Sequence, residues 1–159
     1  MRNEKQRRLF FFAIFALVFY IVGASFVQSF VSYPAWREVG ANEFKAYYHV
    51  VSSRIVRIMV LPGVLEILAT VALLWLRPRV VPRWLVVLAL VLNLVRFVST
   101  AMIQLRVREQ LDSGGLSAQA INRMIHGDYL TQACSIARAL LYVWMMYQVV
   151  SREEPASAG

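Results

Sequence analysis

The sequence is poor in the residues that disulfide-rich and soluble globular proteins use. Among its 159 residues there is one cysteine, with five prolines and seven glycines, and only 16% of the chain is charged. The lone Cys134 excludes an intrachain disulfide and a metal site built on paired cysteines. No His-x-x-His or Glu-x-x-His spacing occurs either, so we expect no metal and no cofactor. The alternative is that His49 and His126 together bind a metal or a haem iron, which the sequence leaves open.

Acidic residues are also scarce, at 9 against 17 lysines and arginines, which gives a net charge of +8. In a soluble protein this excess would suggest nucleic acid as the partner. Here the basic residues flank and interrupt long apolar blocks, and no nucleic-acid-binding motif is present. With 59% of the residues hydrophobic, against about 45–50% in soluble domains, the composition predicts a one-domain integral membrane protein that binds no nucleic acid.

Four apolar segments are long enough to cross a bilayer, which takes about 20 residues each. We expect an all-α, four-helix transmembrane bundle formed by residues 1–150, followed by a polar tail over 151–159. The predicted spans are about 9–30, 54–76, 84–105 and 129–150. A signal peptide is the alternative for the first segment, but its apolar character continues beyond Gly23-Ala24-Ser25, which favours a retained helix.

Two further helical features are expected outside this simple pattern. The second helix extends from Glu43 to Leu76, and Pro62-Gly63 predicts a kink that frees the carbonyl of Ile58. Residues 117–125 predict a short amphipathic helix on the outer side, ended by His126-Gly127. Asp128 would then be the N-cap of the fourth span.

Basic residues also predict the orientation. Four spans place both termini on one side, and the N-terminal cluster and the Arg77/Arg79/Arg83 turn indicate the cytoplasm of a bacterial inner membrane. Other basic residues favour the opposite orientation, since they fall on the other side: Arg37, Lys45, Arg106, Arg108 and Arg123.

Each predicted helix carries polar residues on one side, mainly in the half of the bundle away from the arginine-rich turn. These residues would be costly against lipid, so we expect the four stripes to face one another. They are Ser25, Gln28 and Ser32; Lys45, His49, Ser53 and Arg57; Asn93, Arg96, Thr100 and Gln104; and Asp128, Gln132, Ser135, Arg138 and Tyr142.

The charges within the membrane do not balance. Three arginines (Arg57, Arg96 and Arg138) enter or approach it, whereas Glu66 is the only carboxylate deep inside, and arginine does not deprotonate. One arginine can form a structural ion pair with Glu66. The surplus predicts an electropositive cavity for a phenolate, enolate, carboxylate or phosphate group. Alternatively, the polar residues only hold the helices together, or the arginines reach outward to lipid headgroups.

Within the predicted cavity, His49 is the candidate base, because histidine can accept a proton near neutral pH. The candidate ligand-binding residues are Arg57, Arg96, Gln104, Gln132, Ser135, Arg138 and Tyr142.

The chain resembles the anthrone-oxygenase-like family of small four-helix membrane proteins. The resemblance is carried by Pro34, Trp36 and Phe44, by Thr100-Ala-Met-Ile-Gln104-Leu105, and by Tyr129-Leu-Thr-Gln-Ala-Cys-Ser135-Ile-Ala-Arg138. Thr100 and Gln104 stand where the family has asparagines, and Arg138 alone matches outright. The resemblance implies cofactor-independent oxidation of a polycyclic phenol by dioxygen, with His49 as the base and Arg57, Arg96 and Arg138 stabilising the anion.

Other functions agree with the same residues. The chain could be a non-enzymatic module that binds lipid or quinone, or an accessory subunit of a larger membrane complex. A transporter or channel would require a homo-oligomer, since no inverted repeat is evident. Whether the protein is an enzyme is left open by the sequence.

Overall fold

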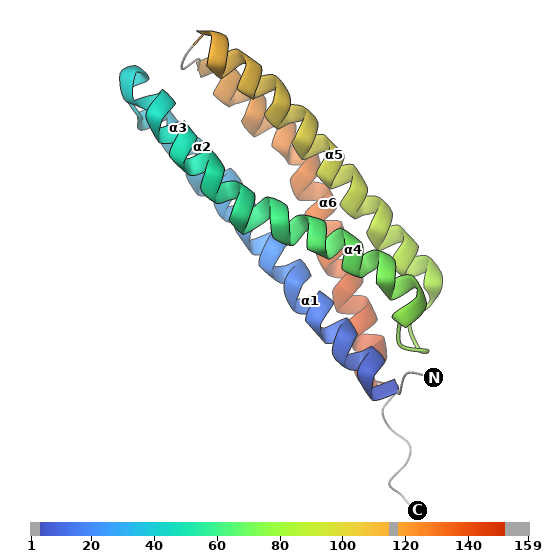
Figure 1. Cartoon of the computed structure of the whole chain (residues 1–159). Coiled ribbons are helices and arrows are strands. Elements are labelled where there is room, and N and C mark those ends of the chain that lie inside the picture. Colours follow the sequence, from blue (N-terminus) through green and yellow to red (C-terminus); the bar gives the residue numbers. More distant parts are fainter. Residues whose placement is uncertain (1–3, 115–117, 152–159) are drawn as a thin grey trace, which may run out of the picture.

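The computed structural model describes residues 4–114 and 118–151, and it describes side chains throughout these ranges except at positions 41, 42, 45 and 103–121. This part of the chain is helical without strands, and four of its helical stretches are long and apolar enough to cross a membrane. The predicted all-α bundle with four spans is therefore confirmed (Figure 1).

The first span is longer than the sequence predicts. Helix α1, Glu4–Val27, continues without a break through the π-helix η1 (Gln28–Ser32), α2 (Tyr33–Ala35) and the 3-10 helix η2 (Trp36–Glu38). Pro34 lies inside this stretch, just after the π-helix η1, and removes one backbone donor there. The chain nevertheless stays helical through Glu38, beyond the predicted end of the span at residue 30.

The second span contains the predicted irregularity. It consists of α3 (Ala41–Ile55), the π-helix η3 (Val56–Val60) and α4 (Leu61–Leu76). Pro62 cannot donate to the carbonyl of Ile58, and that oxygen instead accepts a hydrogen bond from the Tyr20 hydroxyl at 3.0 Å. The helix changes direction between α3 and α4 (Figure 1).

Helices α5 (Arg83–Gly114) and α6 (Ala118–Ser151) complete the bundle. The prediction of a separate amphipathic helix ending at His126-Gly127 is wrong, because α6 passes through both residues. One glycine inside a helix costs only about 1 kcal/mol, which the continuous helix tolerates. Asp128 therefore lies inside α6 and is not an N-cap.

The start of α1, the end of α6 and the turn between α4 and α5 lie at the same end of the bundle, which we call the terminal end (Figure 1). The Arg79 amide donates to the Glu4 carboxylate at 3.1 Å, and Arg7 Nη1 donates to the Arg77 carbonyl at 3.1 Å. These contacts hold the arginine-rich turn against α1.

Two apolar clusters occupy the interior, one toward each end. The larger one fills the terminal half and joins all four spans through residues such as Phe11, Leu73, Val86 and Met145. The smaller one lies toward the opposite end, which we call the far end, and consists of Tyr33, Trp36, Phe44 and Met124. The buried polar residues lie between these two apolar clusters and form a polar layer inside the bundle. This polar layer contains the candidate functional site.

Candidate functional site

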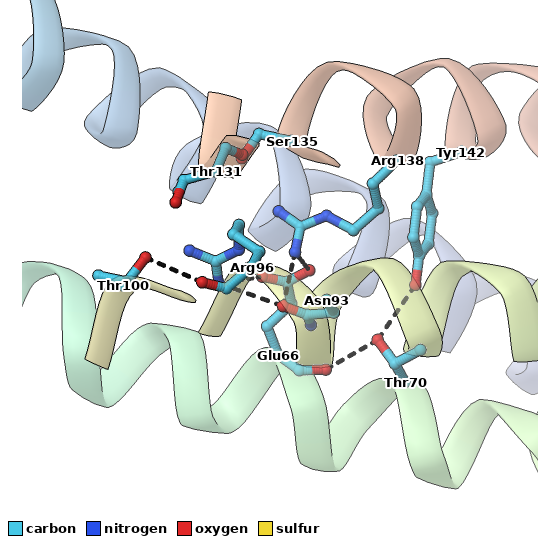
Figure 2. A network of polar contacts seen from close by, with 9 residues as sticks. All are labelled: Glu66, Thr70, Asn93, Arg96, Thr100, Thr131, Ser135, Arg138 and Tyr142. Carbon is cyan, nitrogen blue, oxygen red and sulfur yellow. Dashed lines mark hydrogen bonds and ion pairs between the residues drawn. The ribbon is translucent and has the colours of Figure 1, made fainter. Parts of the chain in front are cut away.

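A buried ion cluster connects α4, α5 and α6 (Figure 2). Arg138 Nη1 lies 2.9 Å from Glu66 Oε1, whereas Arg96 Nη2 lies 3.8 Å from Glu66 Oε2. Asn93 Oδ1 accepts hydrogen bonds from both guanidinium groups, at 2.7 Å from Arg138 and 3.1 Å from Arg96. Glu66 and Asn93 have no exposed surface, so this cluster is fully inside the protein.

The cluster extends toward the terminal end through Tyr142. The Thr70 hydroxyl donates to the Glu66 carbonyl at 2.8 Å and lies 3.2 Å from the Tyr142 hydroxyl. The Tyr142 ring stacks on Phe11, with ring centroids 6.1 Å apart. Tyr142 therefore links the ion cluster to the larger apolar cluster.

The ion cluster contains more positive than negative charge, because Arg96 and Arg138 share the single carboxylate of Glu66. The much shorter distance assigns that carboxylate mainly to Arg138. Arg138 is 1% exposed and Arg96 7%. Arg96 is thus the guanidinium whose charge is less well compensated.

A cavity of about 130 Å³ lies next to Arg96, on its far-end side. Residues of all four spans line it, and four of them belong to the π-helices: Gln28, Ser29, Met59 and Val60. The remaining lining residues are Ser25, Tyr33, Ile55, Arg96, Phe97, Thr100, Ala101, Asp128 and Thr131.

Three polar atoms on residues of this lining have no hydrogen-bond partner among the described residues: Gln28 Nε2, Arg96 Nε and Thr131 Oγ1. Gln28 is 8% exposed and Thr131 1%. A buried polar group without a partner costs about 1–3 kcal/mol. A ligand that accepts hydrogen bonds in the cavity would recover part of this cost.

The carboxylate of Asp128 lies at the far-end side of the cavity and is held by its neighbours. It accepts hydrogen bonds from the Ser29 hydroxyl and, at 3.1 Å, from Gln132 Nε2. Gln132 Nε2 also donates to Ser29 Oγ at 2.5 Å and to Ser25 Oγ at 2.9 Å. The cavity therefore has a cation at one side and a hydrogen-bonded carboxylate at the other.

Several residues that the sequence singles out lie in or beside this polar layer. Glu66, Arg96 and Arg138 form the ion cluster. The Ser135 hydroxyl donates to the Thr131 carbonyl at 2.8 Å, and Gln132 holds Asp128 beside the cavity. Among the candidate ligand-binding residues whose side chains are described, only Arg96 lines the cavity itself.

His49 and Arg57 are not part of this site. Both side chains are exposed and neither lines the cavity, so the expectation that the polar stripe of the second helix faces the interior is wrong for His49, Ser53 and Arg57, the stripe residues whose side chains are described. The physical reason is that α3 turns its apolar side inward, with Phe44 in the far-end cluster and Val51 and Ile55 packed against it. Gln104 belongs to the stretch whose side chains lie outside the description.

The site also contains Asn93, Gln28 and Thr131, which the sequence analysis did not include among the candidate ligand-binding residues. Asn93 and Gln28 are in the predicted polar stripes, so their spacing was a usable signal. Thr131 lies three residues after Asp128 and four before Ser135, so helical spacing places it on the same side and could have found it too. Within the described ranges, no three His, Cys, Asp or Glu side chains come together as metal ligands would.

Comparison of the chain with protein-family models, with curated proteins and with solved structures finds no match.

Proposed function

We propose that this multi-pass membrane protein binds a small molecule through an anionic or phenolic oxygen placed against Arg96. The observation that carries the proposal is the position of Arg96 between the ion cluster and the cavity. Its Nη2 contacts Asn93 and lies 3.8 Å from Glu66, its Nε has no hydrogen-bond partner in the described chain, and the residue is part of the cavity lining.

The donors around the cavity support an oxygen ligand. Gln28 Nε2 and Arg96 Nε can each donate one hydrogen bond, and the Thr131 hydroxyl can donate another. Hydrogen bonds to charged groups contribute about 1.5–3 kcal/mol each, which is more than neutral pairs supply. An anionic oxygen would also compensate the charge that Glu66 leaves over.

The size of the cavity limits the ligand group that it can enclose. Its volume of about 130 Å³ is similar to that of an engineered apolar cavity of about 150 Å³ that binds benzene. A phenol or benzoate group fits this volume. Since the candidate base His49 is exposed and does not line the cavity, we favour binding without catalysis over the oxygenase reaction.

We further propose that the protein resides in a bacterial inner membrane with both termini in the cytoplasm. The support is the cluster of basic residues at the terminal end, which the positive-inside rule assigns to the cytoplasmic side. The cavity would then lie in the outer half of the bilayer. Membrane lipid would surround the bundle, and a homo-oligomer or a larger membrane complex would leave this internal cavity intact.

Binding of benzoate and phenol to the purified protein in detergent tests the proposal. Arg96→Gln should weaken benzoate binding at least about tenfold, the equivalent of about 1.4 kcal/mol, because it removes the cation that faces the ligand. Arg57→Gln is the matched control, since Arg57 is an exposed arginine that does not line the cavity, and it should bind as the wild type does.

Helical content and elution volume show whether Arg96→Gln still assembles. Thr131→Val provides a second variant outside the ion cluster, and it should weaken binding of both probes by a smaller factor. The proposal is overturned if benzoate does not bind the wild type, or if it binds an assembled Arg96→Gln protein with unchanged affinity.

A further inference from the structure

A second hollow lies between the first and second spans. It is a groove of about 400 Å³, more open than the cavity, and most of its lining is apolar. One side is formed by α1 and η1 and the other by α3 and η3. Its lining residues are Tyr20, Ala24, Val27, Gln28, Ser32, Val51, Arg54, Ile55, Ile58 and Met59.

The groove and the internal cavity adjoin each other, because Gln28, Ile55 and Met59 line both of them. Gln28 is nine-tenths buried, and its Nε2 has no partner among the described residues. Gln28 begins the π-helix η1, and Met59 lies in the π-helix η3. π-Helical segments frequently occur at functional sites, and here both of them border the boundary between the two hollows.

We infer that the ligand is an amphiphile with one hydrocarbon tail, whose anionic head lies at Arg96 and whose tail passes between α1 and α3 into the groove. This inference rests on the proposed function, since it takes the head group from there. The tail would pass Gln28, Ile55 and Met59, and Val27 and Ile58 would flank it in the groove.

The distribution of polarity sets the direction of the ligand. The cavity holds the buried donors, whereas the groove is lined by exposed apolar side chains such as Val27 and Ile58, which are 58% and 52% exposed. A groove of this exposure in a membrane span faces the hydrocarbon of the bilayer. A head group in the cavity and a tail in the groove therefore match each part of the ligand with its environment.

The alternative ligand is an ordinary anionic phospholipid with two tails, whose headgroup would bind Arg54 in the groove and not Arg96 in the cavity. Arg54 is an exposed residue of the groove and does not line the cavity. Such a lipid would leave Arg96 and the cavity donors untouched. The two arrangements differ in which arginine they need, so they can be separated by mutation.

A series of 4-alkylbenzoates tests the inference, with the alkyl group extended from methyl to octyl at a fixed detergent concentration. The full-length wild-type protein should bind 4-octylbenzoate about tenfold more tightly than benzoate, because burial of each methylene is favourable. Ala24→Trp places a large ring in the groove at a residue that does not line the cavity. It should abolish the gain with chain length while leaving benzoate binding unchanged.

Ala13→Trp is the matched control, because Ala13 is exposed on the same helix and lies outside both hollows. It should keep the full dependence on chain length. Arg54→Gln should also keep it, whereas Arg96→Gln should weaken binding of every member of the series by at least about tenfold.

The failures are distinguishable. If benzoate binds and needs Arg96, but chain length or Ala24→Trp has no effect, the tail inference is wrong and the proposed function survives. Phospholipid that co-purifies with the wild type and is lost in Arg54→Gln but not in Arg96→Gln would also overturn the inference. Absence of benzoate binding to the wild type overturns both.

Discussion

The terminal half and the far half of the bundle differ in whether a cavity lies beside their buried polar groups. In the terminal half, the Thr70 hydroxyl contacts both the Glu66 carbonyl and the Tyr142 hydroxyl, and the Tyr142 ring stacks on Phe11. In the far half, the hydroxyl of Thr131 and the amide nitrogen of Gln28 have no partner within the described chain and border a cavity. Both regions are polar and buried, but only one of them is closely packed.

The difference shows that buried polarity has two separate uses in this protein. Lipid provides no hydrogen bonds, so polar groups that stabilise the bundle must satisfy one another, as the Thr70 and Tyr142 hydroxyls do beside Glu66. The pairing is incomplete even there, because Arg138 Nε and Nη2 and Asn93 Nδ2 have no partner within the described chain. Polar groups that remain unpaired beside a cavity reduce stability and are explained better by a ligand than by packing. Arg96 belongs to both regions, since its Nη2 contacts Asn93 and the residue also lines the cavity.

The largest expected effect comes from Glu66→Gln, which tests whether the ion cluster stabilises the terminal half. The substitution leaves two buried guanidinium groups without a carboxylate, and breaking a buried pair costs about 3–5 kcal/mol. The free energy of unfolding, measured by SDS titration of the detergent-solubilised protein, should fall by about this amount. Glu38→Gln, at an exposed carboxylate near the end of the first span, should leave the free energy of unfolding unchanged. A loss in Glu66→Gln no greater than in this control would show that the cluster does not stabilise the bundle.

A smaller and more discriminating effect is expected from replacing either of two buried threonines with valine, which keeps the shape and removes the hydroxyl. Thr70→Val removes the contact with Tyr142 and should cost about 0.6–1.5 kcal/mol. Thr131→Val removes an unpartnered hydroxyl, so the free energy of unfolding should stay unchanged or rise. The same SDS titration measures both. Equal losses in the two variants would show that Thr131 is paired in the protein and that the proposed contrast between the halves is wrong.

The sequence predicted the four spans well, because each consists of a long apolar run bounded by charged residues. The effect of Pro62 on the second span was also predictable, because a proline at this position frees the carbonyl of Ile58. In the structure this carbonyl accepts a hydrogen bond from the Tyr20 hydroxyl. The continuity of α6 was not predictable from the sequence. The pair His126-Gly127 is typical of a helix end, yet α6 continues through both residues.

The site was predictable only in part. The predicted spans contain several arginines but only one deeply placed carboxylate. This imbalance identified Glu66, Arg96 and Arg138 from the sequence alone. The orientation of His49 and Arg57 could not be derived, because a stripe at spacing four shows that residues share a face but not which way the face points. Thr131 shares a helix side with Asp128 and Ser135, but its place at the site could not be derived, because the cavity is lined by four spans from distant parts of the chain.

The smallest expected effect concerns the glycine next to Arg96. A Cβ built at Gly63 would lie 3.6 Å from Arg96 Nη2, an ordinary van der Waals contact, and one at Gly23 would meet nothing within 4 Å. Replacing glycine by alanine in a compatible helical position stabilises by about 0.4–1 kcal/mol, so SDS titration should show a similar gain for Gly63→Ala and Gly23→Ala. Benzoate affinity should be unchanged in both. If Gly63→Ala alone weakened benzoate binding, the added methyl group would be blocking a movement of the Arg96 guanidinium toward α4 on ligand binding. Arg96, which connects the two halves of the bundle, would then be mobile rather than fixed.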